Sequence, residues 1–155
     1  MAIASQPHSA EVDEFLDALD CLAQAVRRAR GARSPGSDAQ LTLSQYGLLL
    51  PLADQAEARI RDLAEAAGIT APTATRILDA LERGGIVQRK PASDDRRAIS
   101  VTLTERGRAV LETRHAWIRE RQRAFYATLG PAEHEIAPAL LRGVAELIDE
   151  LAAGP

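Results

Sequence analysis

The stretch Arg61–Arg89, RDLAEAAGITAPTATRILDALERGGIVQR, contains two short helical patterns separated by a turn. The first pattern ends at Gly68, where the position after the helix needs a left-handed backbone that glycine adopts at little cost. Thr70 then stands at the N-cap position of the second pattern, where its hydroxyl could accept a hydrogen bond from a free N–H group. Pro72 suits the first turn, whose N–H groups lack partners within the helix. A helix, a short glycine-containing turn and a second helix form a helix-turn-helix, whose second helix can enter a major groove.

The two helical patterns have a common inward side and a polar outer side. The residues expected to face inward recur at helical spacing: Leu63, Ala66, Ala67, Ala74, Ile77, Leu78 and Leu81. In the second helix, expected over Ala71–Arg83, Thr73, Thr75 and Arg76 lie off this stripe. Threonine can bond base edges or place its methyl group against thymine, and arginine can bind guanine or phosphate. We therefore predict that these three residues, with Thr70 beside them, contact DNA.

A hairpin is expected directly after the second helix. Ile86–Lys90 alternates as a short strand does, and Ile99–Leu103 alternates more cleanly, with Ile, Val and Leu on one face. The polar segment Pro91–Arg97 lies between them and carries two adjacent arginines. A basic hairpin after a helix-turn-helix is a wing. The sequence therefore predicts a mainly α protein with a small β wing, of the winged helix-turn-helix class.

The wing supplies further DNA-binding candidates. We expect Arg96, at the wing tip, to reach the adjacent minor groove, because narrow A·T tracts attract guanidinium groups. Arg97 has two open interpretations, a contact with DNA or an ion pair with Asp95 inside the wing. Arg89 and Lys90 are general candidates for phosphate binding.

The segment Leu63–Leu111 resembles the DNA-binding domain of the MarR (multiple antibiotic resistance regulator) family of bacterial transcription factors. The resemblance covers roughly residues 41–111, and its marks are Leu63-Ala64, Thr75-Arg76, Leu81–Val87, Asp95-Arg96-Arg97, Leu103-Thr104 and Gly107. It implies a homodimer, built by intertwined terminal helices, that binds palindromic operator DNA. It also implies release by a small molecule or by oxidation in many members.

Composition and charge fit this interpretation. The chain has 155 residues and a net charge of −3, with few aromatic residues (Phe 2, Tyr 2, Trp 1). Residues 59–106 carry nine basic against seven acidic side chains, which gives this segment alone a charge of +2. Phosphate binding needs such a local basic face rather than a basic protein. The sequence has no apolar run of membrane-spanning length and no secretory signal, so we expect a cytoplasmic protein without membrane contact.

The expected domains are a winged helix-turn-helix over residues 41–106 and a helical dimerisation region over residues 1–40 and 107–155. Thr42 with Gln45 has the spacing of a capping box that opens a helix over Leu43–Ala53, and Pro51 should kink or end that helix. Residues 58–60 are expected as a third short strand beside the wing.

The regions outside the DNA-binding segment are expected to be amphipathic helices. One runs from Glu11 to about Arg30. Thr104 is expected to cap a long helix to about Leu129, on which apolar residues repeat every seven positions: Leu111, Ile118 and Phe125. A last helix follows Gly130-Pro131, with a kink conceivable at Pro138. The apolar stripes of these helices suit packing against a second chain.

The sequence says less about a signal that the protein senses. The single Cys21 lies opposite the Leu19 stripe, so it is either a reactive thiol or an inert interface residue. His115 and Gln122 interrupt the long-helix stripe and either line a pocket for a small organic anion or pair across an interface. Tyr46 and Trp117 are either pocket walls or core residues.

Two other function classes, an enzyme and a protein-binding module, are possible for a chain of this size. The sequence lacks a phosphate-binding Gly-rich loop, a nucleophile elbow and His spacing suited to a metal, so we expect neither an enzyme nor a cofactor. A winged helix that only binds another protein stays open as an alternative, because a fold does not dictate its function.

Overall fold

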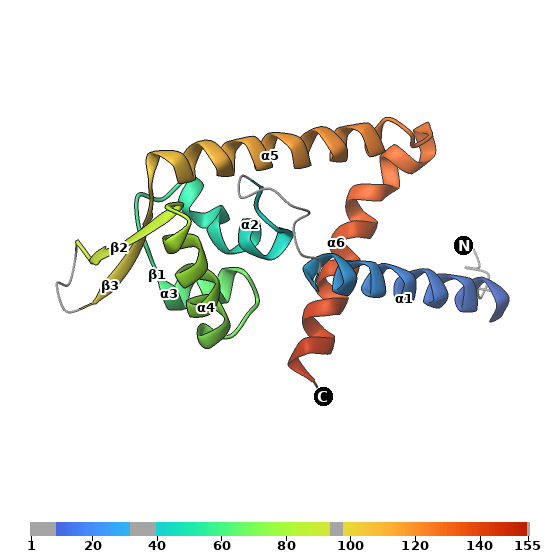
Figure 1. Ribbon diagram of the computed structural model, residues 1–155. Helices are drawn as coiled ribbons and strands as arrows, with labels where there is room; N and C mark the ends of the chain where they lie inside the picture. Colours follow the sequence, from blue (N-terminus) through green and yellow to red (C-terminus); the bar gives the residue numbers. More distant parts are fainter. Residues whose placement is uncertain (1–8, 32–39, 94–97, 155) are drawn as a thin grey trace. The chain divides into compact units, whose positions relative to one another are not determined.

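The computed structural model describes residues 9–31, 40–93 and 98–154. These residues form two compact units, the first ending at Arg114 and the second beginning at His115. The helices and strands follow each other as α1 (Ser9–Gly31), α2 (Leu43–Leu49), η1 (Leu50–Ala53), β1 (Ala58–Arg59), α3 (Ile60–Ala66), α4 (Ala71–Arg83), β2 (Val87–Pro91), β3 (Ile99–Leu103), α5 (Glu105–Tyr126) and α6 (Pro131–Ala153) (Figure 1). The fold is therefore mainly α with a small β wing, as the sequence predicts. None of the helices in the described ranges has the length and apolar character needed to cross a membrane.

The start of α2 shows the predicted capping box. Thr42 Oγ1 accepts a hydrogen bond from the Gln45 N–H at 3.1 Å, and Gln45 Oε1 accepts one from the Thr42 N–H at 2.9 Å. The α-helix ends at Leu49, and Pro51 lies in the 3-10 turn η1 that follows it. The sequence therefore predicted both the beginning of this helix and the residue that ends it.

The turns after α3 and after α4 have the same geometry. Gly68 follows α3 with φ = +61°, and Gly85 follows the last turn of α4 with φ = +67°. In each turn the glycine N–H and the next N–H bond back to helical carbonyls, the pattern of a Schellman motif. After α3 these bonds run to Glu65 O and Ala64 O, each at 3.0 Å. The predicted left-handed Gly68 is confirmed.

The wing is part of a three-stranded antiparallel sheet in the order β1-β3-β2. Val87 pairs with Leu103 at one end of the hairpin, and Pro91 pairs with Ile99 at the other. Ala58 of β1 pairs with Val101 of β3, which confirms the third strand beside the wing. Its predicted third residue, Ile60, instead begins α3.

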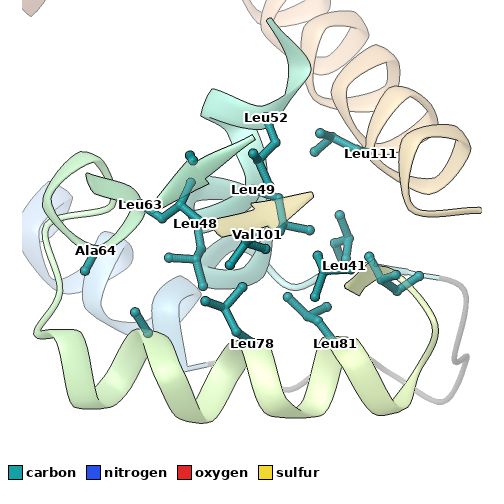
Figure 2. Close-up of a cluster of buried hydrophobic side chains, with 14 residues drawn as sticks. Leu41, Leu48, Leu49, Leu52, Leu63, Ala64, Leu78, Leu81, Val101 and Leu111 are labelled. Atoms are coloured by element: carbon teal, nitrogen blue, oxygen red, sulfur yellow. The ribbon is translucent and has the colours of Figure 1, made fainter. Parts of the chain in front are cut away.

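The hydrophobic core lies among α2, α3, α4 and the sheet (Figure 2). Its members include Leu48, Leu49, Leu63, Ala64, Ala74, Leu78, Leu81 and Val101. The expectation that Ala66 faces inward is wrong: Ala66 is exposed, because α3 packs on the core through Leu63 and Ala64 instead. Ile99 begins the expected strand, but its side chain is 56% exposed at the end of the hairpin, beyond the core.

The junction between the wing and α5 is built around Thr104. Its hydroxyl accepts a hydrogen bond from the Gly107 N–H at 2.9 Å, which confirms the predicted cap. Its backbone N–H donates to Ile86 O at 3.0 Å. Gly107 is buried against the Ile86 backbone, where an added Cβ would lie 1.9 Å from Ile86 O. Only glycine allows the first turn of α5 to approach the turn after α4 this closely.

Helix α6 begins where the sequence predicts, whereas helix α5 ends earlier than predicted. α5 ends at Tyr126 rather than near Leu129, because residues 127–129 form a turn in which the Thr128 hydroxyl donates to Phe125 O at 2.7 Å. α6 begins at Pro131, and the helix continues through Pro138. Of the predicted seven-residue stripe, Leu111 is buried in the core while Phe125 is 65% exposed in the single chain.

Candidate nucleic-acid interface

Helix α4 has one buried and one exposed face. Ala74 and Leu78 are fully buried and Ile77 packs partly against the core, so positions 75 and 76 between them lie on the outer side of the helix. Thr75 and Arg76 are exposed on that outer face, and Thr73 is half-buried. The core that fixes the inner face therefore also fixes the direction of the outer one.

Thr75 and Arg76 offer different chemistry to a ligand. The Thr75 hydroxyl donates to Ala71 O within the helix at 2.9 Å, which leaves its oxygen as an acceptor and its methyl group as an apolar contact. The Arg76 guanidinium makes no hydrogen bond or ion pair with any residue that the structure describes. Its five donors are thus available to a base edge or a phosphate.

Thr70 does not act as the predicted side-chain cap. Its backbone has the extended N-cap conformation, with φ = −73° and ψ = 151°, but its hydroxyl does not bond an N–H of the first turn. The hydroxyl instead lies 2.9 Å from the Thr73 hydroxyl. This pairing places two hydroxyl groups together at the start of α4. The Thr70 carbonyl still accepts the first helical hydrogen bond, from the Ala74 N–H at 2.9 Å.

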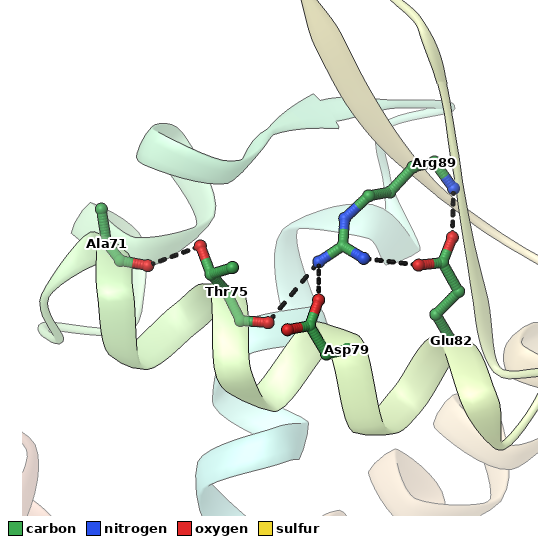
Figure 3. A network of polar contacts seen from close by, with 5 residues as sticks. All are labelled: Ala71, Thr75, Asp79, Glu82 and Arg89. Atoms are coloured by element: carbon green, nitrogen blue, oxygen red, sulfur yellow. Dashed lines mark hydrogen bonds and ion pairs between the residues drawn. The ribbon is translucent and has the colours of Figure 1, made fainter.

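Arg89 of β2 is bound to the side of α4 (Figure 3). Its Nη2 donates to Asp79 Oδ1 at 2.7 Å, and its Nη1 donates to Glu82 Oε2. Desolvation opposes the charged form of Arg89, but the hydrogen bonds to these two carboxylates outweigh it, so the pKa of Arg89 is raised above its ordinary value. The Arg89 guanidinium, a predicted phosphate ligand, thus has two carboxylate partners within the protein.

Glu57 is a further site residue, which sequence reasoning missed, and it bonds both strands of the wing near the loop that joins them. Its carboxylate accepts from the Ser93 N–H at 2.9 Å, from the Ser93 hydroxyl, and from the Ser100 hydroxyl at 2.9 Å. The Ser93 bonds, then the Ser100 bond and the charge of Lys90, hold the pKa of Glu57 below its ordinary value. Ser100 is the one buried polar side chain of the described core, and Glu57 satisfies it.

The turn that ends α4 is tied to the start of α5. The Arg106 Nη1 donates to Gly84 O at 2.8 Å, and the Thr104 hydroxyl donates to Gly85 O at 2.7 Å. Both bonds satisfy carbonyl groups at a helix end, where helical partners are lacking.

The remaining wing candidates are only partly covered by the structure. Lys90 is exposed on β2, opposite Ser100 of β3. Asp95, Arg96 and Arg97 lie outside the described residues, so their expected roles stay predictions.

Two of the predicted ligand residues meet in the second unit. Arg119 donates from Nε to His115 Nε2 at 3.5 Å and from Nη1 to Gln122 Oε1 at 3.1 Å. Gln122 also lines an open hollow of about 360 Å³, together with Arg119, Arg123 and Tyr126. Arginine on this helix face is the component that the sequence analysis missed, although its spacing from His115 and Gln122 could have revealed it.

The other candidates for signal sensing are not among the residues that line that hollow. Tyr46 is half-buried and packs against the core of the first unit. Trp117 is 46% exposed and has the Arg121 guanidinium 5.6 Å from its ring centre, so core packing within the chain is wrong for it. Cys21 is an exposed free thiol on α1. Within the described ranges, His, Cys, Asp and Glu side chains do not gather in threes as a metal site would require.

Comparison with known proteins adds to this geometry. The model of the MarR family matches residues 41–99. Over 115 residues the chain is 31% identical to the HTH-type transcriptional regulator FarR of Neisseria gonorrhoeae, a match that covers 74% of this chain and 79% of FarR.

Two solved structures are similar over nearly their whole length. The transcriptional repressor CouR, bound to a 23-mer DNA duplex, is 27% identical with a TM-score of 0.67, covering 91% of this chain and 99% of CouR. BpsR of Bordetella bronchiseptica, whose DNA binding is regulated by 6-hydroxynicotinic acid, is 25% identical with a TM-score of 0.61, covering 87% and 98% of the two chains.

Proposed function

Because this chain belongs to the MarR family of DNA-binding transcriptional regulators, we propose that it is a homodimeric repressor of an inverted-repeat operator. The observation that carries the proposal is the outer face of α4, where Thr75 and Arg76 are exposed on a helix whose inner face is buried in the core. Such a helix can lie in a major groove while the wing contacts the neighbouring backbone.

The proposed contacts divide by their chemistry. Arg76 binds a guanine edge or a phosphate, and Thr75 offers its methyl group to thymine or its oxygen to an exocyclic amine. The hydroxyl pair of Thr70 and Thr73 lies at the start of α4, where it can bond the sugar-phosphate backbone of the DNA beside the groove. Lys90, Arg96 and Arg97 contribute through the wing. Arg89 is omitted from the proposed contacts because its donors are bound to Asp79 and Glu82.

The homodimer is supported by apolar side chains that the single chain leaves exposed. Over their described lengths, neither α1 nor α6 has a buried residue. The large exposed side chains on them are Val12, Phe15, Leu16, Leu22, Val26, Ile136, Leu140, Leu141, Leu147, Ile148 and Leu151. Apolar surface of this extent is rarely left in water by a stable monomer. We propose that residues 1–40 and 107–155 bury it against a second copy, and that residues 41–106 bind DNA.

A two-fold dimer presents two copies of α4, so its operator should have two inverted half-sites about one helical turn apart. The role also assigns the protein to the compartment that holds the DNA, the cytoplasm.

An effector is the second part of the proposal. DNA binding by the similar BpsR is regulated by 6-hydroxynicotinic acid, an aromatic acid. In this chain, the hollow beside Gln122 offers two arginines and a tyrosine ring, a set of groups suited to a small aromatic anion. We propose that such an anion releases the protein from its operator.

Two alternatives would give different results in solution. A winged helix that only docks on another protein would bind duplex DNA weakly and without dependence on Arg76. A thiol-based sensor would lose operator binding on oxidation and keep it when Cys21 is replaced by serine.

The proposal is tested by measuring the mass of the complex. The protein would be mixed with a duplex from its own upstream intergenic DNA, and the complex analysed by size exclusion with light scattering. We expect a dimer in free solution, one dimer on each duplex, and a nuclease footprint with two-fold symmetry. A monomer in free solution, or a footprint without symmetry, would contradict the proposal.

A further inference from the structure

We infer that Arg89 is a positioning residue, which holds the β2–β3 hairpin against α4 and thereby sets DNA affinity without touching DNA. The inference rests on the proposed DNA-binding function. It differs from the phosphate contact that the sequence suggested for Arg89, and the two interpretations predict opposite results for its acidic partners.

The contacts of Arg89 reach along much of α4 (Figure 3). Its Nη2 lies 2.7 Å from Asp79 Oδ1 and 3.5 Å from Thr75 O, and its Nη1 bonds Glu82 Oε2. Its backbone N–H donates to the other oxygen of Glu82 at 3.1 Å. The hairpin is thus joined to the helix through main chain and side chain at the same residue.

The Arg89 side chain is the least exposed of the three charged side chains in this network. The Arg89 side chain is 21% exposed, against 50% for Asp79 and 38% for Glu82. Phosphate would therefore meet the two carboxylates more readily than the guanidinium between them. An arginine arranged in this way neutralises the two acidic groups beside the DNA-binding face and does not extend beyond them to bind a DNA phosphate.

The geometry of the network requires arginine. Asp79 and Glu82 lie one turn apart on α4, and the two terminal nitrogens of Arg89 each bond one of them. The planar guanidinium offers donors in a fixed fork, whereas a lysine ammonium is a single point charge. Lysine at position 89 would keep the positive charge but could not hold both acids in this geometry.

The position of the hairpin matters because the wing and α4 act on the same duplex. Thr75 lies within the network through its carbonyl, and it is also one of the exposed candidates for base contact. A hairpin that moves against α4 would separate the wing contacts from the groove contacts. The protein could then no longer form the wing contacts and the groove contacts on one duplex at their full strength.

The decisive variant is Glu82→Gln, measured by fluorescence anisotropy on the upstream duplex. Loss of a negative charge from a DNA-binding protein favours phosphate binding in general. If Arg89 is a positioning residue, Glu82→Gln instead weakens binding, by roughly two- to thirtyfold. Equal or tighter binding overturns the inference. Glu65→Gln, with the same charge change at an exposed position of α3, is the matched control and should bind as well as the wild type or slightly better.

The Arg89 variants add a second readout. Arg89→Lys should weaken binding about as much as Arg89→Met, and neither should change the slope of log affinity against log salt. A phosphate contact predicts that lysine preserves affinity and that methionine reduces the slope by about 0.9. That pattern would also overturn the inference.

Hydrogen exchange without DNA separates this inference from the proposed function. Arg89→Lys and Glu82→Gln should each speed amide exchange in β2 and β3, while Glu65→Gln leaves it unchanged. Unchanged exchange in both Arg89→Lys and Glu82→Gln would refute the positioning role of Arg89, whether or not the protein binds DNA. Failure of the wild type to bind any duplex, with exchange behaving as expected, would instead refute the proposed function and confine Arg89 to holding the wing.

Discussion

Replacing Gly107 with alanine should destabilise the first unit by about 3–5 kcal/mol. Gly107 lies in the first turn of α5, against the backbone of Ile86. An added Cβ would lie 1.9 Å from Ile86 O and 2.9 Å from its carbonyl carbon, whereas real Cβ atoms essentially never come within 3.0 Å of such neighbours. The two backbones must therefore separate by about 1 Å, because neither is a flexible side chain that could turn away.

The magnitude follows from what that separation breaks. The Thr104 N–H bonds Ile86 O at 3.0 Å, and the Thr104 hydroxyl donates to Gly85 O at 2.7 Å, both across the same contact. Two hydrogen bonds at about 1 kcal/mol each, added to overpacking of about 1–3 kcal/mol, give the expected range. It is a large part of the ~5–15 kcal/mol by which a domain is normally stable.

Urea unfolding followed by circular dichroism measures the effect, at one fixed protein concentration because dimer formation adds to apparent stability. Gly47→Ala is the control, since a Cβ at Gly47 in α2 meets no atom within 4 Å. It should be neutral or stabilising by up to about 1 kcal/mol, through the higher helix propensity of alanine. The reasoning is refuted if Gly107→Ala lies within about 0.5 kcal/mol of the wild type, which is the ordinary range for a surface substitution.

Three further predictions use the same assay. Gly68→Ala should destabilise by about 1–2 kcal/mol, because φ is +61° there and a Cβ disfavours that conformation; a loss near zero would contradict it. Leu78→Ala should destabilise by about 2–5 kcal/mol by opening a cavity in the core, and a smaller loss would mean that α4 is not packed as described. The folded-state pKa of Glu57 is lowered, so its stabilisation is present above the ordinary glutamate pKa of ~4.3 and is lost as the pH falls through the lower folded value. Glu57→Gln should therefore flatten the acid side of the stability curve, and identical curves would count against this role.

The helix-turn-helix could be predicted closely because its signals are local. Gly68 predicted a left-handed turn, Pro51 predicted the end of a helix, and Thr42 with Gln45 predicted a capping box. Each feature is present where the sequence indicated it. Such signals depend on the residue itself and its immediate neighbours. They do not require knowledge of what packs against the segment.

Apart from the Thr70 hydroxyl, which bonds the nearby Thr73 hydroxyl instead of capping α4, the errors arose where a distant segment decides the outcome. Ala66 and Ala64 are equally suited to a helix interior, and only the packing of α3 against the core selects Ala64. Ile99 alternates correctly with Val101 but lies past the end of the core. Periodicity assigned each of these residues to a face, but it does not give the extent of the surface that packs against that face.

The polar network of the site was the least predictable part. Arg89 and its partners Asp79 and Glu82 are separated by up to ten positions, and Glu57 bonds residues 36 and 43 positions away. No sequence spacing predicts such pairs. The Arg89 contacts follow from the packing of β2 on α4, and the Glu57 contacts follow from the pairing of β1 with β3. An arginine read from sequence as a phosphate ligand was for this reason found bound to carboxylates.

The most direct test of DNA recognition by α4 compares the wild type with Arg76→Ala on two duplexes at two salt concentrations. The duplexes are the upstream intergenic DNA and a scrambled sequence of the same composition, titrated by fluorescence anisotropy. We expect the wild type to prefer the upstream duplex, and Arg76→Ala to lose about 1–3 kcal/mol of that preference. Equal binding of both duplexes by the wild type, or an unchanged preference in the variant, would contradict recognition through α4.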